Sequence, residues 1–587
     1  MTLRTLMAMP PARPVLVWAL IAVGLVAMNL GNIATRHFPD PDDTLRLVQV
    51  RDLLGGQGWF DLHQYRINPP YGTLMHWSRL VDLPLALMIA ALTPLLGAAN
   101  AEITTMVTMP LLTMLAIVLV VDRLAGRLFD RQATVFACLC LGLAPLLMAQ
   151  VQPLRIDHHG WQIFTVMAAL LGLLPGAGVK GAAWSAAALA FGLSISLELL
   201  PVTAAFGGVF ALRWLTAPRS PHDLMSYLAT LTGTLAALFL ATRGLADLAA
   251  HCDSVSPPYL VMLAGVTAGT CGAAALRPRS WLAVLALLAL SGAAALAVFL
   301  WLAPACSAGP FAALDPLVRE YWYNNIQEGR PAWNSPLVLA GPAIAQGVIG
   351  LAVVVHLWLR SSGEERRWWL SYLLVTVAAF ATGLMLWRGM AFVGALAALP
   401  LGWLAARMMA GVGNARSTGC KLAIVSALLM VLVPSLPGAL IQDFTPARAA
   451  EAQVPSNPAS EACGLPASAD RLGALAPATI FAPMDVGPAL LVETHHAVVA
   501  SSHHRAAAAM HDVIAAFTGS TDLAHRLIIK HRAGYVMVCT DLTEARLYAN
   551  RAPGGFADQL IKGRVPPWLE PVALGGPAEF KLWKMHG

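Results

Sequence analysis

The sequence has 587 residues, of which 57% are hydrophobic and only 12% are charged, and its mean hydropathy is +0.65. Soluble globular proteins carry about twice this charged fraction, so the composition excludes an ordinary soluble domain and predicts an integral membrane protein. The formal net charge of +6 does not indicate nucleic-acid binding, because most lysines and arginines fall in short gaps between apolar runs, where they determine membrane topology.

The first predicted span runs from Val15 to about Ile33. It follows Arg4 and Arg13, and no small-residue cleavage site comes after it, so we expect an uncleaved helix and not a signal peptide. Further apolar runs, each long enough for a helix to cross the hydrocarbon layer, continue to about Leu440. About fourteen runs begin near Val15, Leu83, Ile103, Ala133, His159, Ala182, Pro201, Leu224, Tyr259, Trp281, Pro336, Trp369, Gly389 and Leu422.

The run Leu83–Ala99 determines the orientation of every later loop. If it does not cross the membrane, clustered cations fall in alternate loops on the cytoplasmic side, and the opposite loops hold isolated ones. Its interior prolines, Pro84 and Pro94, fit a short helix at the outer interface. We therefore expect a polytopic α-helical protein with about thirteen spans. The cytoplasmic cations are then Arg123, Arg127, Arg131, Lys180, Arg213, Arg219, Arg277, Arg279, Arg360, Arg366, Arg367, Arg407, Arg416 and Lys421.

This topology divides the chain into a membrane domain, 1–440, with large outer loops at 36–100 and 304–335, and an outer C-terminal domain, 441–587. The C-terminal composition predicts an α/β domain after a linker rich in Pro, Ser and Ala. Its expected strands are Thr479–Ala482, Ala497–Ser501 and Tyr535–Cys539, and its expected helix is Arg505–Thr518.

Four cysteines fall on the predicted outer side, in two sets: Cys252 with Cys306 in loops, and Cys463 with Cys539 in the C-terminal domain. Pairing within each set would suit an oxidising periplasm, and unpaired thiols are the alternative. Three cysteines inside spans are expected to be free: Cys138, Cys140 and Cys271.

Two polar motifs adjoin predicted spans. Pro39-Asp40-Pro41-Asp42-Asp43 follows the first span; one aspartate is expected to cap the helix Thr44–Leu54, which leaves two carboxylates for other roles. Arg155-Ile156-Asp157-His158-His159 opens a later span. Asp157 could be only a helix cap and the histidines only interfacial, but an aspartate beside two histidines also forms half of a divalent-metal site.

Two more motifs complete the outer-face set. Tyr321–Glu328 lies in the second outer loop, where Glu328 is either a solvated loop residue or a ligand. Arg388, in Trp387-Arg388-Gly389, lies on the side where cations are disfavoured. It is either an interfacial anchor or a phosphate partner, a role that suits a guanidinium.

Together, these motifs place carboxylates, a histidine pair and an arginine on one face of the membrane. A metal held by hard carboxylate ligands neutralises the charge that develops on a leaving phosphate, and an arginine binds the same oxygens. This combination suits chemistry on a phosphorylated lipid.

The order of these motifs resembles that of the catalytic subunit of oligosaccharyltransferase, of the GT-C type with single-subunit bacterial and archaeal members. The resemblance covers roughly Val15–Leu440 and implies thirteen spans, two large outer loops and an outer C-terminal domain. The metal-binding aspartate after span one looks like Asp42, with Asp43 the close alternative. Asn68-Pro69-Pro70-Tyr71-Gly72 resembles a Tyr-Pro-x-Gly segment of the same loop.

The remaining family motifs also have counterparts. The second acidic motif looks like Asp157-His158-His159, and a Thr-Ile-x-Glu type motif looks like Asn325-Ile326-Gln327-Glu328, with the threonine replaced. Arg388 looks like the arginine that contacts the lipid phosphate. The family's Trp-Trp-Asp-Tyr-Gly motif, which reads the N-glycosylation sequon, is missing here, so a hydroxyl on a lipid, glycan or protein is as suitable an acceptor as asparagine.

The resemblance implies a glycosyltransferase at the outer face of a bacterial inner membrane. It would move a sugar from a polyprenyl-phosphate or -diphosphate carrier with Mg²⁺ or Mn²⁺ as cofactor. The expected catalytic residues are Asp42, Asp157 and Glu328; the expected metal ligands are these three and His159; the expected substrate contacts are Arg388, Arg155 and Tyr71.

Two other functions remain open. A transporter or flippase of a lipid-linked or anionic solute would place ionisable groups at mid-membrane, where Glu198 and His356 are nearly the only candidates. A scaffold protein would use the outer domain for binding. That domain contains four histidines, His495, His496, His503 and His504. They could suggest a metal site, but we expect them to be exposed loop residues.

Overall fold

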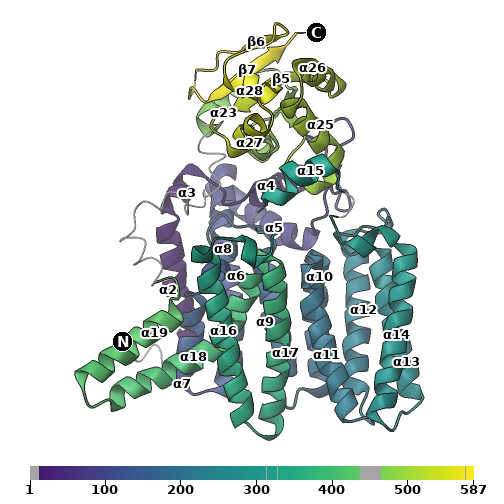
Figure 1. Cartoon of the computed structure of the whole chain (residues 1–587), viewed down its shortest axis with the longest axis vertical. Helices are drawn as coiled ribbons and strands as arrows, with labels where there is room; N and C mark the ends of the chain where they lie inside the picture. The colour runs from purple at the N-terminus through teal and green to yellow at the C-terminus, as the bar shows by residue number, and fades with distance from the viewer. Residues whose placement is uncertain (1–11, 312–313, 327, 437–464, 576, 587) are drawn as a thin grey trace.

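A computed structural model describes residues 12–311, 314–326, 328–436, 465–575 and 577–586. A bundle of long apolar helices carries a smaller α/β domain at one end (Figure 1). The predicted boundary at 440/441 lies outside the described residues.

Within the described residues, ten helical segments are long and apolar enough to cross a membrane, and up to eleven if one bent pair is counted as a span. The chain is therefore a multi-pass membrane protein. The ten segments are α5 (Arg79–Leu96), α6 (Ala98–Leu128), α10 (Gly178–Ile195), η2–α11 (Leu197–Thr216), α12 (His222–Thr242), α13 (Pro257–Ala275), α14 (Trp281–Leu302), α16 (Leu337–Arg360), α17 (Gly363–Met385) and η6–α18 (Trp387–Asn414).

The other apolar helices are shorter. The bent pair meets at 68°, and the remaining ones have 10–17 residues; a count of thirteen spans stays a prediction. These helices are α7 (Arg131–Leu141) with α8 (Pro145–Val151), then α2 (Ala12–Met28), α9 (His159–Leu170) with η1 (Leu171–Leu173), and α19 (Thr418–Leu432).

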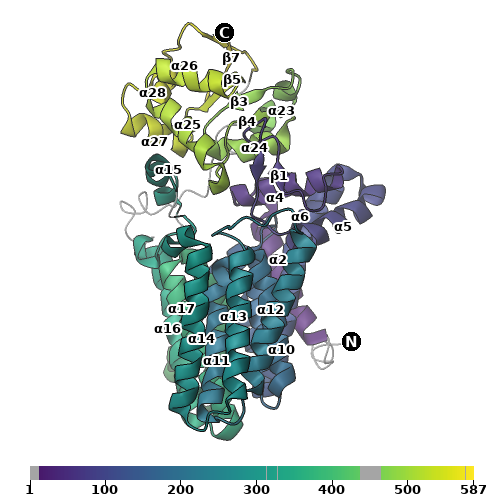
Figure 2. The ribbon, with the colours of Figure 1, turned by 90° about the vertical axis from the view of Figure 1, so that its right-hand side faces the viewer.

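Helix α5 satisfies the length criterion but lies above the bundle, at the level of α4 (Pro41–Leu54) (Figure 2). It contains both prolines, Pro84 and Pro94, and packs on α4 and α6. This position agrees with the expectation that the apolar run Leu83–Ala99 does not cross with the others.

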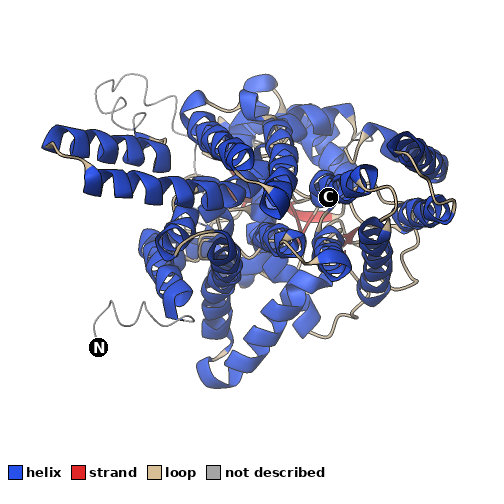
Figure 3. Cartoon of the chain, turned by 90° about the horizontal axis from the view of Figure 1, so that it is seen from below, coloured by secondary structure: helices blue, strands red, loops and turns tan. Residues whose placement is uncertain are grey.

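Helix α18 is the most buried of the long helices, with 89% of its apolar window inside the protein. It crosses α7 closely at Gly402, where a Cβ atom would lie 2.3 Å from the backbone nitrogen of Ala137. Small residues allow such close helix crossings. The end of α18 and the following α19 project sideways from the bundle (Figures 1 and 3).

The C-terminal domain is built on a five-stranded sheet in the order β4-β3-β5-β7-β6. Three strands are parallel, and β7 and β6 are antiparallel to their neighbours. The central strand β5 buries four consecutive residues against helices on the sheet. The predicted α/β character is confirmed by β3 (Thr479–Phe481), β4 (Ala497–Val498), α25 (Ala507–Thr518), β5 (Ala533–Cys539), β6 (Leu569–Pro571) and β7 (Phe580–Met585).

This domain shares a hydrophobic core with the first outer loop, since Leu45 and Val48 of α4 and Trp77 are buried together with the domain's own apolar residues. The loop also extends the sheet: Val498 of β4 donates to the carbonyl of Arg66 (2.8 Å) and accepts from the amide of Asn68 (2.9 Å). Outer loop and domain therefore form one assembly.

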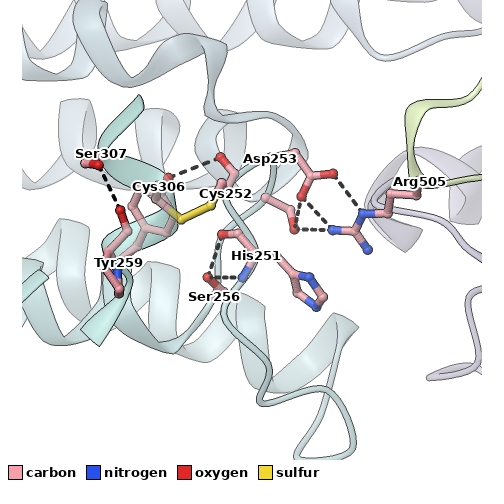
Figure 4. Close-up of a disulfide and its surroundings, with 10 residues drawn as sticks. His251, Cys252, Asp253, Ser256, Tyr259, Cys306, Ser307 and Arg505 are labelled. Carbon is pink, nitrogen blue, oxygen red and sulfur yellow. Dashed lines mark hydrogen bonds and ion pairs between the residues drawn. A yellow bond between two sulfur atoms is a disulfide. The ribbon is translucent and has the colours of Figure 1, made fainter. Parts of the chain in front are cut away.

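The predicted disulfide Cys252–Cys306 is present, with the two Cα atoms 5.1 Å apart (Figure 4). It joins the loop before α13 to η3 (Pro304–Ala308), where the second outer loop begins. Cys463, the predicted partner of Cys539, lies outside the described residues. The expected free thiols are confirmed: Cys138, Cys140 and Cys271.

Candidate functional site

The acidic motif after the first span forms the N-terminus of α4. Asp40 caps the helix by accepting from the amide of Asp42 (2.9 Å), and Pro41 takes the first helical position, where its missing N–H costs nothing. Asp42 and Asp43 then lie in the first turn, where the positive end of the helix dipole favours carboxylates. The expected capping aspartate is thus Asp40.

Asp43 is fully buried and occupies a structural position. Its carboxylate contacts the Arg155 guanidinium (3.1 Å) and accepts from the backbone amide of Asp157 (2.8 Å). The same Arg155 nitrogen lies 2.9 Å from Asp40, and the other lies 3.7 Å from Glu328. Arg155 therefore ties together three segments that are far apart in the sequence.

Asp157 and the two histidines after it are all buried at the start of α9. Asp157 Oδ1 accepts from His158 Nδ1 at 2.5 Å, and Oδ2 lies 2.9 Å from His159 Nδ1. Burial opposes ionisation of Asp157, but the charges of His158 and His159 and the hydrogen bond from His158 lower its pKa well below the usual value. His158 and not Asp157 occupies the cap position of α9, so capping does not account for Asp157.

A second arginine closes the opposite side of the cluster. Arg388, in η6 (Trp387–Gly389), pairs with Glu198 of η2 (Leu197–Leu199) and lies 3.4 Å from Glu328. Its backbone amide donates to the Glu328 carbonyl at 3.1 Å, which fixes the second outer loop against the start of α18. Glu198 also lies 3.9 Å from His159.

A buried polar layer supports Asp157 from α4 and α5. Arg46, with no exposed surface, pairs with Asp82 (2.9 Å) and contacts Asp157 Oδ1 (3.3 Å). Asp82 also accepts from Gln49 (2.5 Å) and from Arg79 (3.2 Å). Full pairing of these charges is needed because an unpaired buried charge is very costly.

Several atoms of the cluster fit a cation. Asp157 Oδ2 and both ring nitrogens of His159 are buried without a hydrogen bond in the described structure. Adjacent ligands at about 2.1 Å in octahedral geometry are about 3 Å apart, which matches the 2.9 Å between Asp157 Oδ2 and His159 Nδ1. Asp42 adds a half-buried carboxylate that makes no ion pair within the described residues. Burial and the charges of Asp40, Asp157 and Glu328 raise its pKa well above the usual value, an effect that a cation would reverse.

The structure thus brings together all four predicted metal ligands and Arg388. The predicted substrate contact Arg155 is 6% exposed and ion-paired, which indicates a positioning role. Tyr71 is 81% exposed, and no ion pair or hydrogen bond of the described residues links it to the cluster.

The sequence did not predict the roles of Glu198, Asp40 and Arg46. Glu198 was noted only as one of the few ionisable residues that a transporter could place at mid-membrane; its position at the end of a span was the signal that could have placed it here. The expectation of exposed outer-domain histidines is wrong for three of the four. His496 and His503 are buried and His504 is half-buried, because these residues face the shared core and the first outer loop; only His495 is exposed.

The chain is similar in architecture to solved structures of an archaeal enzyme. The oligosaccharyltransferase AglB from Archaeoglobus fulgidus, in complex with an inhibitory peptide and a dolichol-phosphate, is similar with a TM-score of 0.67 and 13% identity, over 97% of this chain and 75% of that chain. The chain therefore has the fold of these oligosaccharyltransferase structures. The Archaeoglobus fulgidus enzyme in the apo form gives a TM-score of 0.68 and 13% identity, over 95% and 73% of the two chains.

A third structure of the Archaeoglobus fulgidus enzyme, its complex with Zn and sulfate, gives a TM-score of 0.61 and 12% identity, over 97% and 73%. No protein-family model and no curated protein sequence matches this chain. The likeness therefore lies in the fold, and the function is inferred from the residues of this chain.

Proposed function

We propose that the protein is a metal-dependent glycosyltransferase that moves a sugar or oligosaccharide from a polyprenyl-phosphate or -diphosphate carrier to an acceptor. The observation that carries this proposal is the convergence of Asp42, Asp157, His159 and Glu328 with Arg388, where the bundle meets the outer assembly. The fold supports it, and a solved structure with this fold contains a dolichol-phosphate.

Each residue has a distinct role in this proposal. Asp42, Asp157, His159 and Glu328 hold a divalent cation, Mg²⁺ or Mn²⁺, which supplies Lewis-acid neutralisation of the carrier phosphate. Arg388 binds the same phosphate through its guanidinium fork. Asp42, which makes no ion pair with any described residue, also orients or deprotonates the acceptor.

The ion pairs prepare these groups for the reaction. Arg46 contacts the ligand Asp157, and Arg155 pairs with Asp43, which accepts from the backbone amide of Asp157. Asp157 therefore needs little reorganisation when substrate binds. The location of the ionisable cluster at one end of the bundle favours this function over transport, in which such groups line a path through the membrane. The proposed compartment is the periplasmic face of a bacterial inner membrane.

The direct test uses the full-length protein in lipid nanodiscs with a polyprenyl-diphosphate sugar and a panel of hydroxyl and asparagine acceptors. Asp42→Asn should reduce sugar transfer by at least about 100-fold, because it removes a metal ligand. Chelation of divalent cations should have the same effect, and added Mg²⁺ or Mn²⁺ should reverse it.

Asp52→Asn is the matched control, since Asp52 lies on the same helix and is half-buried but outside the cluster. Full transfer activity in both variants would contradict the proposal. A C-terminal reporter provides a second check, because a cytosolic signal would separate the outer domain from the proposed site of transfer.

A further inference from the structure

A second group of histidines lies between the outer domain and the first outer loop. His76 follows β2 (Thr73–Leu74) of the loop, and His503 and His504 follow β4 of the domain. One nitrogen from each of the three rings lies within 4.8 Å of the others. Their ring centroids are 5.0, 5.0 and 4.9 Å apart.

The three rings are enclosed to different degrees: His503 is buried, and His76 and His504 are half-buried. Imidazole nitrogen is a common ligand of transition metals. His503 is 3% exposed, and its Nδ1 has no hydrogen-bond partner in the described structure.

The third ring is oriented from outside the group. Asp253 accepts from His504 Nε2 at 2.6 Å. This contact occupies Nε2 and leaves Nδ1 as the nitrogen of His504 that is available to a metal. Carboxylates orient metal-binding histidines in this way at zinc sites.

The surrounding charges are balanced. Arg505 forms two contacts with Asp253, at 2.8 and 2.7 Å (Figure 4), and Arg243 pairs with Asp247 at 3.2 Å. Each nearby guanidinium thus has its own carboxylate, and neither opposes a cation with its full charge.

The distances are short enough for direct coordination. Tetrahedral nitrogen ligands at about 2.1 Å from Zn²⁺ are about 3.4 Å apart. His76 Nδ1 and His503 Nε2 share a hydrogen bond at 3.0 Å, which a metal bound between them would replace, and one nitrogen of His504 lies within 4.8 Å of the other two ligand atoms. Three histidines with an open fourth position form a common zinc-binding set.

We propose that His76, His503 and His504 form a transition-metal site of the Zn²⁺ class that fastens the C-terminal domain to the first outer loop. This site is separate from the Asp157 cluster and has a different ligand chemistry, three imidazoles in place of carboxylates. The loop that contains Asp253 is also joined through Cys252 and Cys306 to the second outer loop (Figure 4). The metal therefore connects the domain to both outer loops.

Two ring contacts of Trp77 connect the site to the proposed catalytic cluster. The ring of Trp77 lies between His503, at 5.3 Å between centroids, and the Arg46 guanidinium, at 4.5 Å. Arg46 contacts Asp157. Metal binding would thus help to hold Arg46 in the position that supports Asp157.

The test counts Zn²⁺ bound to the full-length protein, purified in detergent without a polyhistidine tag, stripped with a chelator and titrated with Zn²⁺ alone. The background variant Asp157→Asn/His159→Gln removes binding at the other cluster. We expect this background to retain about one tightly bound Zn²⁺ per chain, and the Zn²⁺ to raise its unfolding temperature.

His503→Gln in the same background should abolish both the bound Zn²⁺ and the temperature shift. His495→Gln is the matched control, because His495 is an exposed histidine of the same domain, and it should change neither. Absence of stoichiometric Zn²⁺ in the background chain would overturn the proposal whether or not the His503 variant folds. Retention of Zn²⁺ by a folded His503→Gln chain would also overturn it.

Discussion

The protein contains two groups of histidines and carboxylates that the chain builds in opposite ways. Asp157, His158 and His159 are consecutive, so one helix start brings them together. His76 and His503 are 427 residues apart and meet only because the outer domain packs on the first outer loop. The first group is therefore a property of a local segment, and the second is a property of the docking of two segments.

The largest expected difference between the two groups is in transfer activity. Asp157→Asn should lower the rate by at least about 100-fold, since it removes a proposed metal ligand. His503→Gln should lower it by less than about 10-fold, because its effect reaches the site only through Trp77 and Arg46. Rates of sugar transfer from a polyprenyl-diphosphate donor measure both, and equal losses in the two variants would contradict the separation of roles.

The next effect concerns the ion pairs of Arg155, which lie beside the first group. Arg155→Met leaves the carboxylates of Asp43 and Asp40 without their cation, and breaking a buried pair in this way costs about 3–5 kcal/mol. The variant should unfold at a clearly lower temperature in detergent, whereas Arg155→Lys should retain part of the stability. An unchanged unfolding temperature for Arg155→Met would show that the pairing has no structural role.

A smaller effect is expected at the edge of the second group. Arg505→Met removes two contacts to Asp253, and hydrogen bonds to charged groups contribute about 1.5–3 kcal/mol. The loss should appear as faster hydrogen exchange where the outer domain meets the first loop, with no change inside the membrane helices. Uniform acceleration over the whole chain would mean that the domain does not dock as a separate unit.

A last effect is a pH dependence that belongs to neither group. Burial and the charge of Asp485 raise the pKa of Glu544 to about 8 from a value of 4.5. The folded domain therefore binds more protons than the unfolded chain between these values, so its stability should fall as pH rises through this window. Thermal unfolding from pH 5 to about pH 8 measures this slope, and Glu544→Gln should flatten it. A stability that increases with pH in the native chain and not in the variant would contradict this assignment.

Much of the architecture was predictable. Hydropathy identified every apolar run that forms a helix, and the positive-inside pattern set the Leu83–Ala99 run apart, where the structure places α5 above the bundle. Alternation and turn residues predicted the α/β domain. These patterns are readable because each reports a local interaction with lipid, water or the neighbouring strand.

The cluster was predictable only in part. The proposed ligands Asp42, Asp157 and Glu328 stand beside spans as recognisable polar motifs, whereas Glu198 was noted only for the transport alternative and the pairing of Arg155 with Asp40 and Asp43 was not anticipated. Whether a charged residue is free or paired depends on which distant segment it meets, and no local pattern contains that information.

By itself, the sequence determined that the chain is a multi-pass membrane protein with polar motifs at the ends of its spans, because the transfer free energy of apolar and charged residues depends on composition alone. Only the tertiary structure decided which carboxylates are neutralised by arginine, which remain available to a cation, and that His76 meets His503 and His504. These outcomes depend on distances between remote segments, because hydrogen bonds and metal–ligand bonds form only between atoms a few ångströms apart.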